Sequence, residues 1–333
     1  MKTPIARITL ALALVSLLGV AAARADAEDK ITKTFKVAPG GQLVIEADRG
    51  SIEVKTADSE SVDIEVTRKA GGSQSRAEEI LKDHVVTLSQ DANNVQVHAE
   101  YKGEKLSGWF GNWRNLQVKF LVTVPRKFDV NLKTAGGSIA VAGLTGQLQA
   151  GTSGGSLKFE QIEGPVTGRT SGGSITLTGG KGKVDLKTSG GSVHLSEIEG
   201  DVSAQSSGGS IHADHLAGKA VVKTSGGGIE VSAIKGQIEA GTSGGSITTT
   251  LTEQPSGACS FKTSGGGITV VLSEKVEVDI DARTSGGRVT SELPVVSVVQ
   301  GEQRKNELKG KINGGGPLIT AHTSGGSVHI RKK

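Results

Sequence analysis

Residues 170–177 read Thr-Ser-Gly-Gly-Ser-Ile-Thr-Leu, and this stretch returns along the chain with small changes. The blocks begin at Thr134, Thr152, Thr170, Thr188, Ser206, Thr224, Thr242, Thr263, Thr284 and Thr323. The numbering advances by 18 in each of the first six steps and by 21 in the next two. It advances by 39 in the last step, which leaves room for one coil plus a loop. Such a short fixed period indicates a repeat architecture.

Apolar residues alternate with polar ones on both sides of each block, as strands require. Val184 and Leu186 precede Thr188, and Val193 and Leu195 follow it. A second glycine corner recurs at Gly146, Gly164, Gly200, Gly218 and Gly236. Glycine at both corners is expected to supply positive φ and close approach between turns.

The period selects the fold class, because a unit of about 18 residues is too short for a βαβ crossover or a propeller blade. We expect each coil to stack on the one before it, about 4.8 Å apart, as a β-solenoid. The prediction is an all-β protein: a single solenoid with about 18-residue coils, two short strands per coil, and a cap over its open edges.

The composition agrees with a repetitive β architecture. The 333 residues include 49 Gly and only nine aromatic residues, which argues against two ordinary globular cores. Hydrophobic residues make up 35% of the chain, which argues against disorder, and no every-third glycine indicates collagen.

Residues 1–25 predict a secretory signal peptide. Lys2 and Arg7 precede an apolar run, Ile8 to Val20, and Ala23-Arg24-Ala25 offers a cleavage site. Removal of this segment lowers the formal net charge from +4 to +1. No second apolar run predicts a transmembrane segment in the mature chain. We expect an exported bacterial protein, periplasmic, secreted or at the cell surface.

The mature chain is expected to form one continuous body. Residues 26–133 predict an N-terminal β-rich part of the solenoid that also caps it, and residues 134–333 the regular repeats. Ala77 to Lys82 predicts a short helix. Strands are predicted at Leu43 to Ala47, Val62 to Val66, Val85 to Leu88, Val95 to His98 and Leu116 to Val124. A separate N-terminal globular domain is the alternative.

The chain resembles the bacterial DUF4097 family, whose members are also called candidate adhesins. The likeness rests on Arg49-Gly50-Ser51-Ile52-Glu53-Val54, on Val122-Thr-Val-Pro-Arg-Lys127 and on the repeated Thr-Ser-Gly-Gly-Ser-Ile coils. It covers nearly the whole mature chain. The resemblance implies an exported or envelope-associated β-solenoid, and it carries over no catalytic motif.

One ladder of the repeats is basic. The residue before each block opening is Lys133, Arg169, Lys187, Lys223, Lys262, Arg283 or His322, on the outward parity. We call these seven residues the basic column. Asp185, Glu239 and Asp281 lie two residues earlier and offset part of this charge, as on an ordinary solvated face. The functional alternative is a stripe that binds an anionic polymer such as lipopolysaccharide or an acidic glycan. Nucleic acid is not expected, because no aromatic residues are interleaved.

Two histidines invite a metal hypothesis. His194 and His212 are one repeat apart in the same ladder, with Asp214, His215 and Glu230 nearby. The alternative is that two adjacent surface coils simply carry histidine, and no metal or other cofactor is expected. Cys259, the only cysteine, is expected to be a buried small hydrophobe, so an internal disulfide is excluded.

Both tryptophans lie in one short segment that contains Trp109, Phe110 and Trp113. An exposed tip would suit sugar stacking, a membrane surface or a partner. A segment folded back would plug the open end of the solenoid, which is the interpretation we prefer because a cap must bury apolar surface.

An enzyme is not expected. A polysaccharide lyase or hydrolase on a β-helix needs a groove with clustered carboxylates, and these coils have almost no insertions to wall one. An ice-binding threonine array is also disfavoured, because the column is one rank wide and its parity points inward. The sequence therefore predicts an exported non-catalytic solenoid that contacts envelope glycans, lipopolysaccharide or surface proteins.

Overall fold

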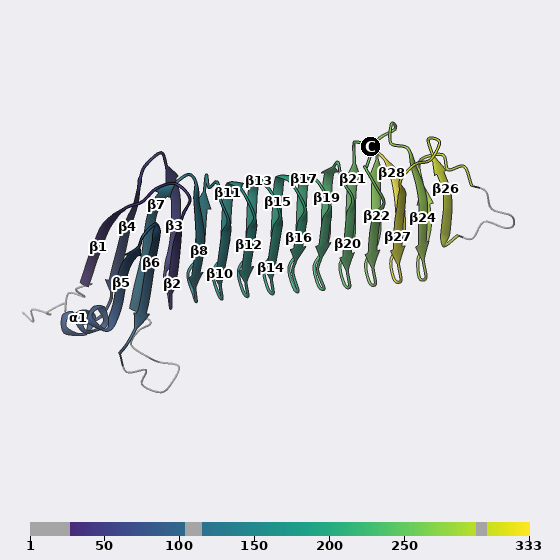
Figure 1. The fold of residues 1–333 in the computed structure, drawn as a ribbon. Coiled ribbons are helices and arrows are strands. Elements are labelled where there is room, and N and C mark those ends of the chain that lie inside the picture. Colours follow the sequence, from purple (N-terminus) through teal and green to yellow (C-terminus); the bar gives the residue numbers. More distant parts are fainter. Residues whose placement is uncertain (1–26, 104–114, 298–304) are drawn as a thin grey trace, which may run out of the picture.

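The computed structural model describes residues 27–103, 115–297 and 305–333. Within these residues two sheets of 14 strands each run along an elongated body, and their inward faces enclose one hydrophobic core. Figure 1 shows the strands side by side like slats, with the helix α1 (Gln74–Asp83) at the N-terminal end. The all-β, solenoid-like architecture predicted from the repeats is confirmed.

Each coil contributes one strand to each of the two sheets. The first sheet has the order β1 (Ala27–Lys36), β4 (Ser61–Ala70), β7 (Leu116–Pro125), β3 (Ser51–Ala57), β9 (Ile139–Ala142), β11 (Leu157–Glu163), β13 (Ile175–Lys181), β15 (Val193–Glu199), β17 (Ile211–Ala217), β19 (Ile229–Ile234), β21 (Ile247–Leu251), β23 (Ile268–Leu272), β28 (Val328–Lys332) and β25 (Val289–Ser291). The second sheet has the order β5 (His84–Asp91), β6 (Asn94–Tyr101), β2 (Gly41–Ala47), β8 (Phe128–Thr134), β10 (Leu148–Thr152), β12 (Val166–Thr170), β14 (Val184–Thr188), β16 (Val202–Gln205), β18 (Ala220–Lys223), β20 (Ile238–Thr242), β22 (Cys259–Thr263), β27 (Leu318–Thr323), β24 (Val278–Thr284) and β26 (Glu307–Ile312).

The alternation of side chains within a strand places the core. In β14, Val184, Leu186 and Thr188 are buried, whereas Asp185 is half-buried and Lys187 is exposed. Neighbouring repeats pair in parallel, so that a residue stacks on the equivalent residue of the next coil, as in Val166 on Val184. Each inward position therefore forms an apolar ladder that removes aliphatic surface from water.

The threonine that opens each block is a core hydrogen-bonding residue. Thr170 Oγ1 donates to the carbonyl of Gly155 in the preceding coil at 2.8 Å, and the Gly173 amide donates to Thr170 Oγ1 at 3.3 Å. The donor bond to a carbonyl of the adjacent coil recurs at Thr134, Thr152, Thr188, Ser206, Thr224, Thr242, Thr263, Thr284 and Thr323. A buried hydroxyl thus satisfies backbone groups that the corner would leave unpaired.

The coils do not stack in chain order at either end, and here the expectation that each coil lies on the one before it is wrong. At the N-terminal end, the coil of β2 and β3 lies between the coil of β6 and β7 and that of β8 and β9. At the C-terminal end, β27 and β28 are inserted between β22 and β23 on one side and β24 and β25 on the other. Figure 1 shows this C-terminal insertion, with the yellow β27 between the greener β22 and β24.

Hydrogen bonds across the corners match the inserted order. Thr323 donates to the Gly266 carbonyl of the β22–β23 coil at 2.7 Å, and Thr284 donates to the Gly326 carbonyl of the inserted coil at 2.6 Å. The interval before Thr323, predicted to hold one coil plus a loop, contains β25, β26 and β27 among the described residues. The strand β25 pairs in parallel with β28, and β27 pairs in parallel with β22 and β24, as in a coil. The segment predicted as a loop contains β26, which pairs antiparallel with β24.

The N-terminal part continues the same two sheets. Each of the five strands predicted there coincides with part of β2, β4, β5, β6 or β7, and the predicted helix lies inside α1. The strand β1 was missed, because it is an edge strand with Lys30, Lys33 and Lys36 and little apolar patterning. It pairs antiparallel with β4, and α1 packs Ala77 and Ile80 against the end of the core. No helix in the described stretches has the length and apolarity that a membrane crossing requires.

Candidate functional site on the second sheet

The basic column lies on the outward face of the second sheet, as its parity predicts. Each of these side chains lies between two buried residues that flank it in the chain, so its head points to solvent, as Lys187 does between Leu186 and Thr188. Partners in register place the column residues on strands about 4.8 Å apart.

The column differs from the sequence expectation in order and continuity. Gly151, Gln205 and Gly241 stand in it between the basic residues. Because of the inserted coil, His322 lies between Lys262 and Arg283 rather than beyond both. The longest uninterrupted run is therefore Lys262, His322 and Arg283, at the C-terminal end.

Several members of the column are paired with carboxylates, as the solvated-face interpretation expects. Lys133 Nζ lies 3.2 Å from Glu46, Arg169 Nη2 lies 2.9 Å from Asp185, and Lys223 Nζ lies 2.7 Å from Glu239. The hydrogen bond from Lys223 lowers the pKa of Glu239 below its ordinary value. Exposed pairs of this kind contribute about 0–1 kcal/mol each.

Two lysines of the column have no such partner. Among the described residues, neither Lys187 nor Lys262 has a carboxylate oxygen within 4.0 Å of its ammonium group. Their positive charges are therefore not cancelled by a direct contact within the protein, and they are the members of the column most able to attract an external anion.

The C-terminal end of the column is tied together by Asp281 of β24. This half-buried carboxylate accepts from Arg283 Nε at 2.8 Å and from Nη2 at 3.2 Å, and its Oδ1 lies 3.3 Å from His322 Nε2. Burial acts to raise the pKa of Asp281, but the hydrogen bonds from Arg283 and His322 outweigh it and the pKa is lowered. The hydrogen bond and the charge of Asp281 in turn raise the pKa of Arg283.

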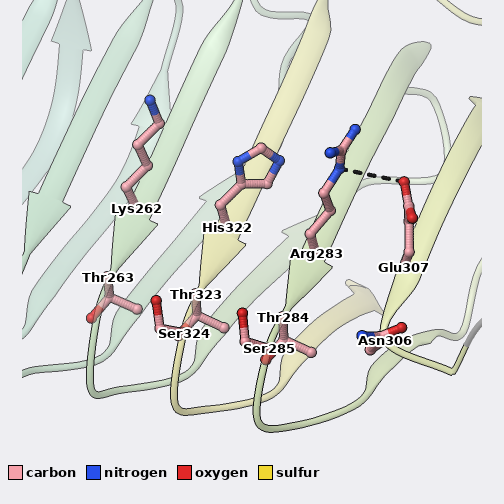
Figure 2. A pocket seen from close by; sticks show the side chains of 10 residues that line it. All are labelled: Lys262, Thr263, Arg283, Thr284, Ser285, Asn306, Glu307, His322, Thr323 and Ser324. Carbon is pink, nitrogen blue, oxygen red and sulfur yellow. Dashed lines mark ion pairs between the residues drawn. The ribbon is translucent and has the colours of Figure 1, made fainter.

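A hollow of about 450 Å³ lies beside this network (Figure 2). Figure 2 shows Lys262, His322 and Arg283 in a row on three adjacent strands, with Ser324 and Ser285 at the corners below them. Asn306 and Glu307, at the start of β26, line its other side. The sequence did not point to Ser285, Ser324, Asn306 and Glu307, because nothing in the repeat indicates that β27 enters between β22 and β24.

The histidine pair lies on the outward face of the first sheet. His194 and His212 are register partners, and their rings stack with centroids 5.0 Å apart at an interplanar angle of 4°. Within the described residues, no group of three or more His, Cys, Asp or Glu side chains is arranged to hold a metal ion.

The neighbours of the histidine pair are engaged in their own contacts. His212 Nδ1 lies 3.2 Å from Glu230, and His215 Nδ1 lies 2.7 Å from Asp214. Burial, and then the nearby His212, lower the pKa of His194, which favours a neutral ring. The arrangement is that of a polar surface ladder rather than of converging ligands.

Two further candidates from the sequence are the lone cysteine, which is buried, and the aromatic segment, which lies outside the described residues. Cys259 is buried, and burial raises the pKa of its thiol, which disfavours the reactive thiolate. The aromatic segment with Trp109, Phe110 and Trp113 lies outside the described residues, so the choice between a plug and a binding tip stays a prediction.

Fold and surface together define a class: an elongated all-β repeat protein with two polar, charge-bearing outer faces. The sequence profile of the DUF4097 family, described as Toastrack DUF4097, matches residues 41–331, and the chain belongs to this family. The resemblance noted from the sequence is thereby confirmed. A search of curated proteins gave no match.

Solved structures that match this chain come from species of Bacteroides and Parabacteroides, among others. A candidate adhesin from Bacteroides fragilis is 13% identical, with 92% of this chain and 97% of that chain covered and a TM-score of 0.34. A candidate adhesin from Parabacteroides merdae is 12% identical, with 90% and 95% covered and a TM-score of 0.35. A candidate lipid-binding protein from Parabacteroides distasonis is 13% identical, with 91% and 96% covered and a TM-score of 0.34.

Proposed function

We propose that this protein is an exported, non-catalytic solenoid that acts as an adhesin-like binding or structural component of the bacterial envelope, with about 18-residue coils as its building unit. Its contact surface is the outward face of the second sheet, and its ligands are polyanions such as acidic glycans or lipopolysaccharide. The observation that carries this proposal is the basic column, which presents Lys187 and Lys262 without a carboxylate contact among the described residues.

Periodic charge supports a repeating ligand. Strand spacing places successive column positions about 4.8 Å apart, so a long anion lying along the body meets several cations at once. Each contact is individually weak because it is exposed and screened, and binding is therefore expected to depend steeply on salt.

Charge reversal tests the proposal. The triple variant Lys187→Glu, Lys223→Glu and Lys262→Glu should abolish salt-sensitive binding of the protein to purified lipopolysaccharide and to acidic polysaccharide. Binding that survives the triple variant, or no binding by the unchanged protein, contradicts a polyanion-binding role. Turnover of the polysaccharide during the assay contradicts the non-catalytic part of the proposal.

The export part of the proposal can be tested separately from ligand binding. The protein recovered from the periplasm or medium of a bacterial host should have a mass that corresponds to a chain beginning at Asp26. Recovery of the uncleaved chain from the cytoplasm alone contradicts it.

A further inference from the structure

The hollow at the C-terminal end of the second sheet has the composition of a binding site and not only of a charged face. Its volume of about 450 Å³ falls within the range of about 300–1,000 Å³ that is usual for small-molecule sites. It exists because β27 is inserted between β22 and β24, which brings Lys262, His322 and Arg283 onto adjacent strands.

The charge of the hollow is positive on balance. Its lining contains Lys262 and Arg283 and one carboxylate, Glu307, which is shared between Arg283 at 3.4 Å and Lys309 at 3.5 Å. Asp281, the other partner of Arg283, does not line the hollow. Lys262 has no carboxylate within 4.0 Å among the described residues, so its ammonium group is available to an external oxyanion.

Neutral hydrogen-bonding groups complete the lining. The hydroxyls of Thr263, Thr284 and Thr323 are already donated to carbonyls of the neighbouring coils. The side chains of Ser285, Ser324 and Asn306 are exposed, and no side-chain hydrogen bond to another described residue engages them. Figure 2 shows them below and beside the row of basic side chains. Hydroxyls and an amide beside two cations match a sugar that carries an acidic group.

We propose that this hollow binds one acidic sugar residue of a polysaccharide. The oxyanion of the sugar lies against Lys262 and the free side of Arg283, above His322, and its hydroxyls meet Ser285, Ser324 and Asn306. The inference rests on the polyanion-binding function proposed above, and it turns a uniform stripe into a specific subsite. The oxyanion is the carboxylate of a uronate or a sulfate ester on the sugar.

Fluorescence anisotropy with labelled oligogalacturonate and labelled dextran sulfate oligosaccharides tests the subsite, with neutral dextran as a third probe. Lys262→Gln should weaken binding of at least one acidic probe by about tenfold or more, since it removes a charge-assisted hydrogen bond. Asn306→Ala should weaken binding of the same probe, because the Asn306 amide is proposed to contact a hydroxyl of the sugar. The probe affected identifies the oxyanion.

The matched control is Lys187→Gln, since Lys187 stands in the same column, is also exposed and also has no carboxylate contact among the described residues. It should weaken binding of the acidic probe clearly less than Lys262→Gln does, because β14 lies four strands away from β22 and the hollow. Equal weakening by Lys187→Gln and Lys262→Gln overturns the subsite and leaves the column as a uniform polyanion surface. Unchanged binding in every variant overturns both ideas, as does equal binding of neutral dextran. Thermal unfolding of each variant verifies that the fold is kept.

Discussion

The Thr-Ser-Gly-Gly corner depends on close approach between coils at its second glycine. A Cβ on Gly155 would lie 2.1 Å from the Gly137 carbonyl oxygen, whereas a Cβ on Gly154 would lie 3.7 Å from that of Gly136. Neither glycine has positive φ, so the expectation of positive φ is wrong at this corner. At the opposite corner it holds for four of the five predicted glycines, but not for Gly236. Gly164 there has a φ of 143°, and a Cβ would lie 2.2 Å from the Gly146 oxygen.

This difference predicts unequal effects of two adjacent substitutions. Gly155→Ala should lower the free energy of unfolding by about 3 kcal/mol, because the backbone of the preceding coil must move. Gly154→Ala should be neutral or stabilise by up to about 1 kcal/mol, since its conformation suits alanine and the unfolded chain loses freedom. Urea denaturation compares them, and equal effects would contradict the close-approach explanation.

A left-handed position was not visible in the sequence. Gln161, Glu197, His215 and Ala233 have φ between 51° and 58° at equivalent places near the ends of first-sheet strands. Gly143 and Gly179, at the same place in their coils, have φ of 75° and 71°. Because four different non-glycine residues occupy this position, no residue type marks it along the chain.

In the N-terminal cap, the structure adds to the sequence prediction the surroundings of a buried histidine. The helix α1 packs against β1, β4 and β5, and the first residue of β5 is His84, which is 0% exposed. Asp29, Arg68 and Arg49 surround it, and Asp48 Oδ1 lies 3.8 Å from its Nε2. Burial lowers the pKa of His84, and the two arginines add to this, against the opposing effect of Asp48 and Asp29.

The cap should therefore loosen on acidification. In the unfolded chain His84 binds a proton with a pKa of about 6.5, whereas its pKa in the folded cap is lower. Stability is therefore intact above about pH 6.5 and is lost as the pH falls from there to the lowered pKa, with a slope of at most about 1.4 kcal/mol per pH unit. Amide hydrogen exchange in β5 and β6 between about pH 5 and 8 measures the loss, after correction for intrinsic exchange.

His84→Phe should remove the pH dependence of this local opening, because the new ring is of similar size and does not titrate. The same substitution at His98, which is exposed in β6, is the control and should keep it. If His84→Phe opens with the same pH profile as the unchanged protein, another group is responsible.

The order of the coils is a property of the whole molecule. Thr284 follows Thr263 at the same interval that separates Thr263 from Thr242, and this spacing favours β24 stacking directly on β22. The structure instead places β27 there, with Cys259 of β22 paired with Ile319 of β27 and Ile319 paired with Ile280 of β24. Stacking in chain order would make Ile280 the neighbour of Cys259.

The native cysteine makes this order testable. Ile319→Cys should form an intrachain disulfide with Cys259 under mild oxidation, because paired residues on neighbouring strands lie about 4.8 Å apart, within the range of about 4.4–6.8 Å that a disulfide spans. Ile280→Cys should not, since it stands two strands away. Mass spectrometry of the oxidised, digested variants distinguishes them, and a bridge in the Ile280→Cys protein alone would establish chain-order stacking.

The sequence by itself determined the strands of the repeats, the two kinds of corner and the outward parity of the basic column, because these follow from local alternation and from the fixed length of the repeat. It also indicated the family. Only the tertiary structure decided which coil meets which at the two ends, and with it the hollow of Lys262, His322 and Arg283. The physical reason is that nearly identical Thr-Ser-Gly-Gly blocks offer the same ladder of hydrogen bonds to any coil, so the repeat specifies how coils stack but not their order.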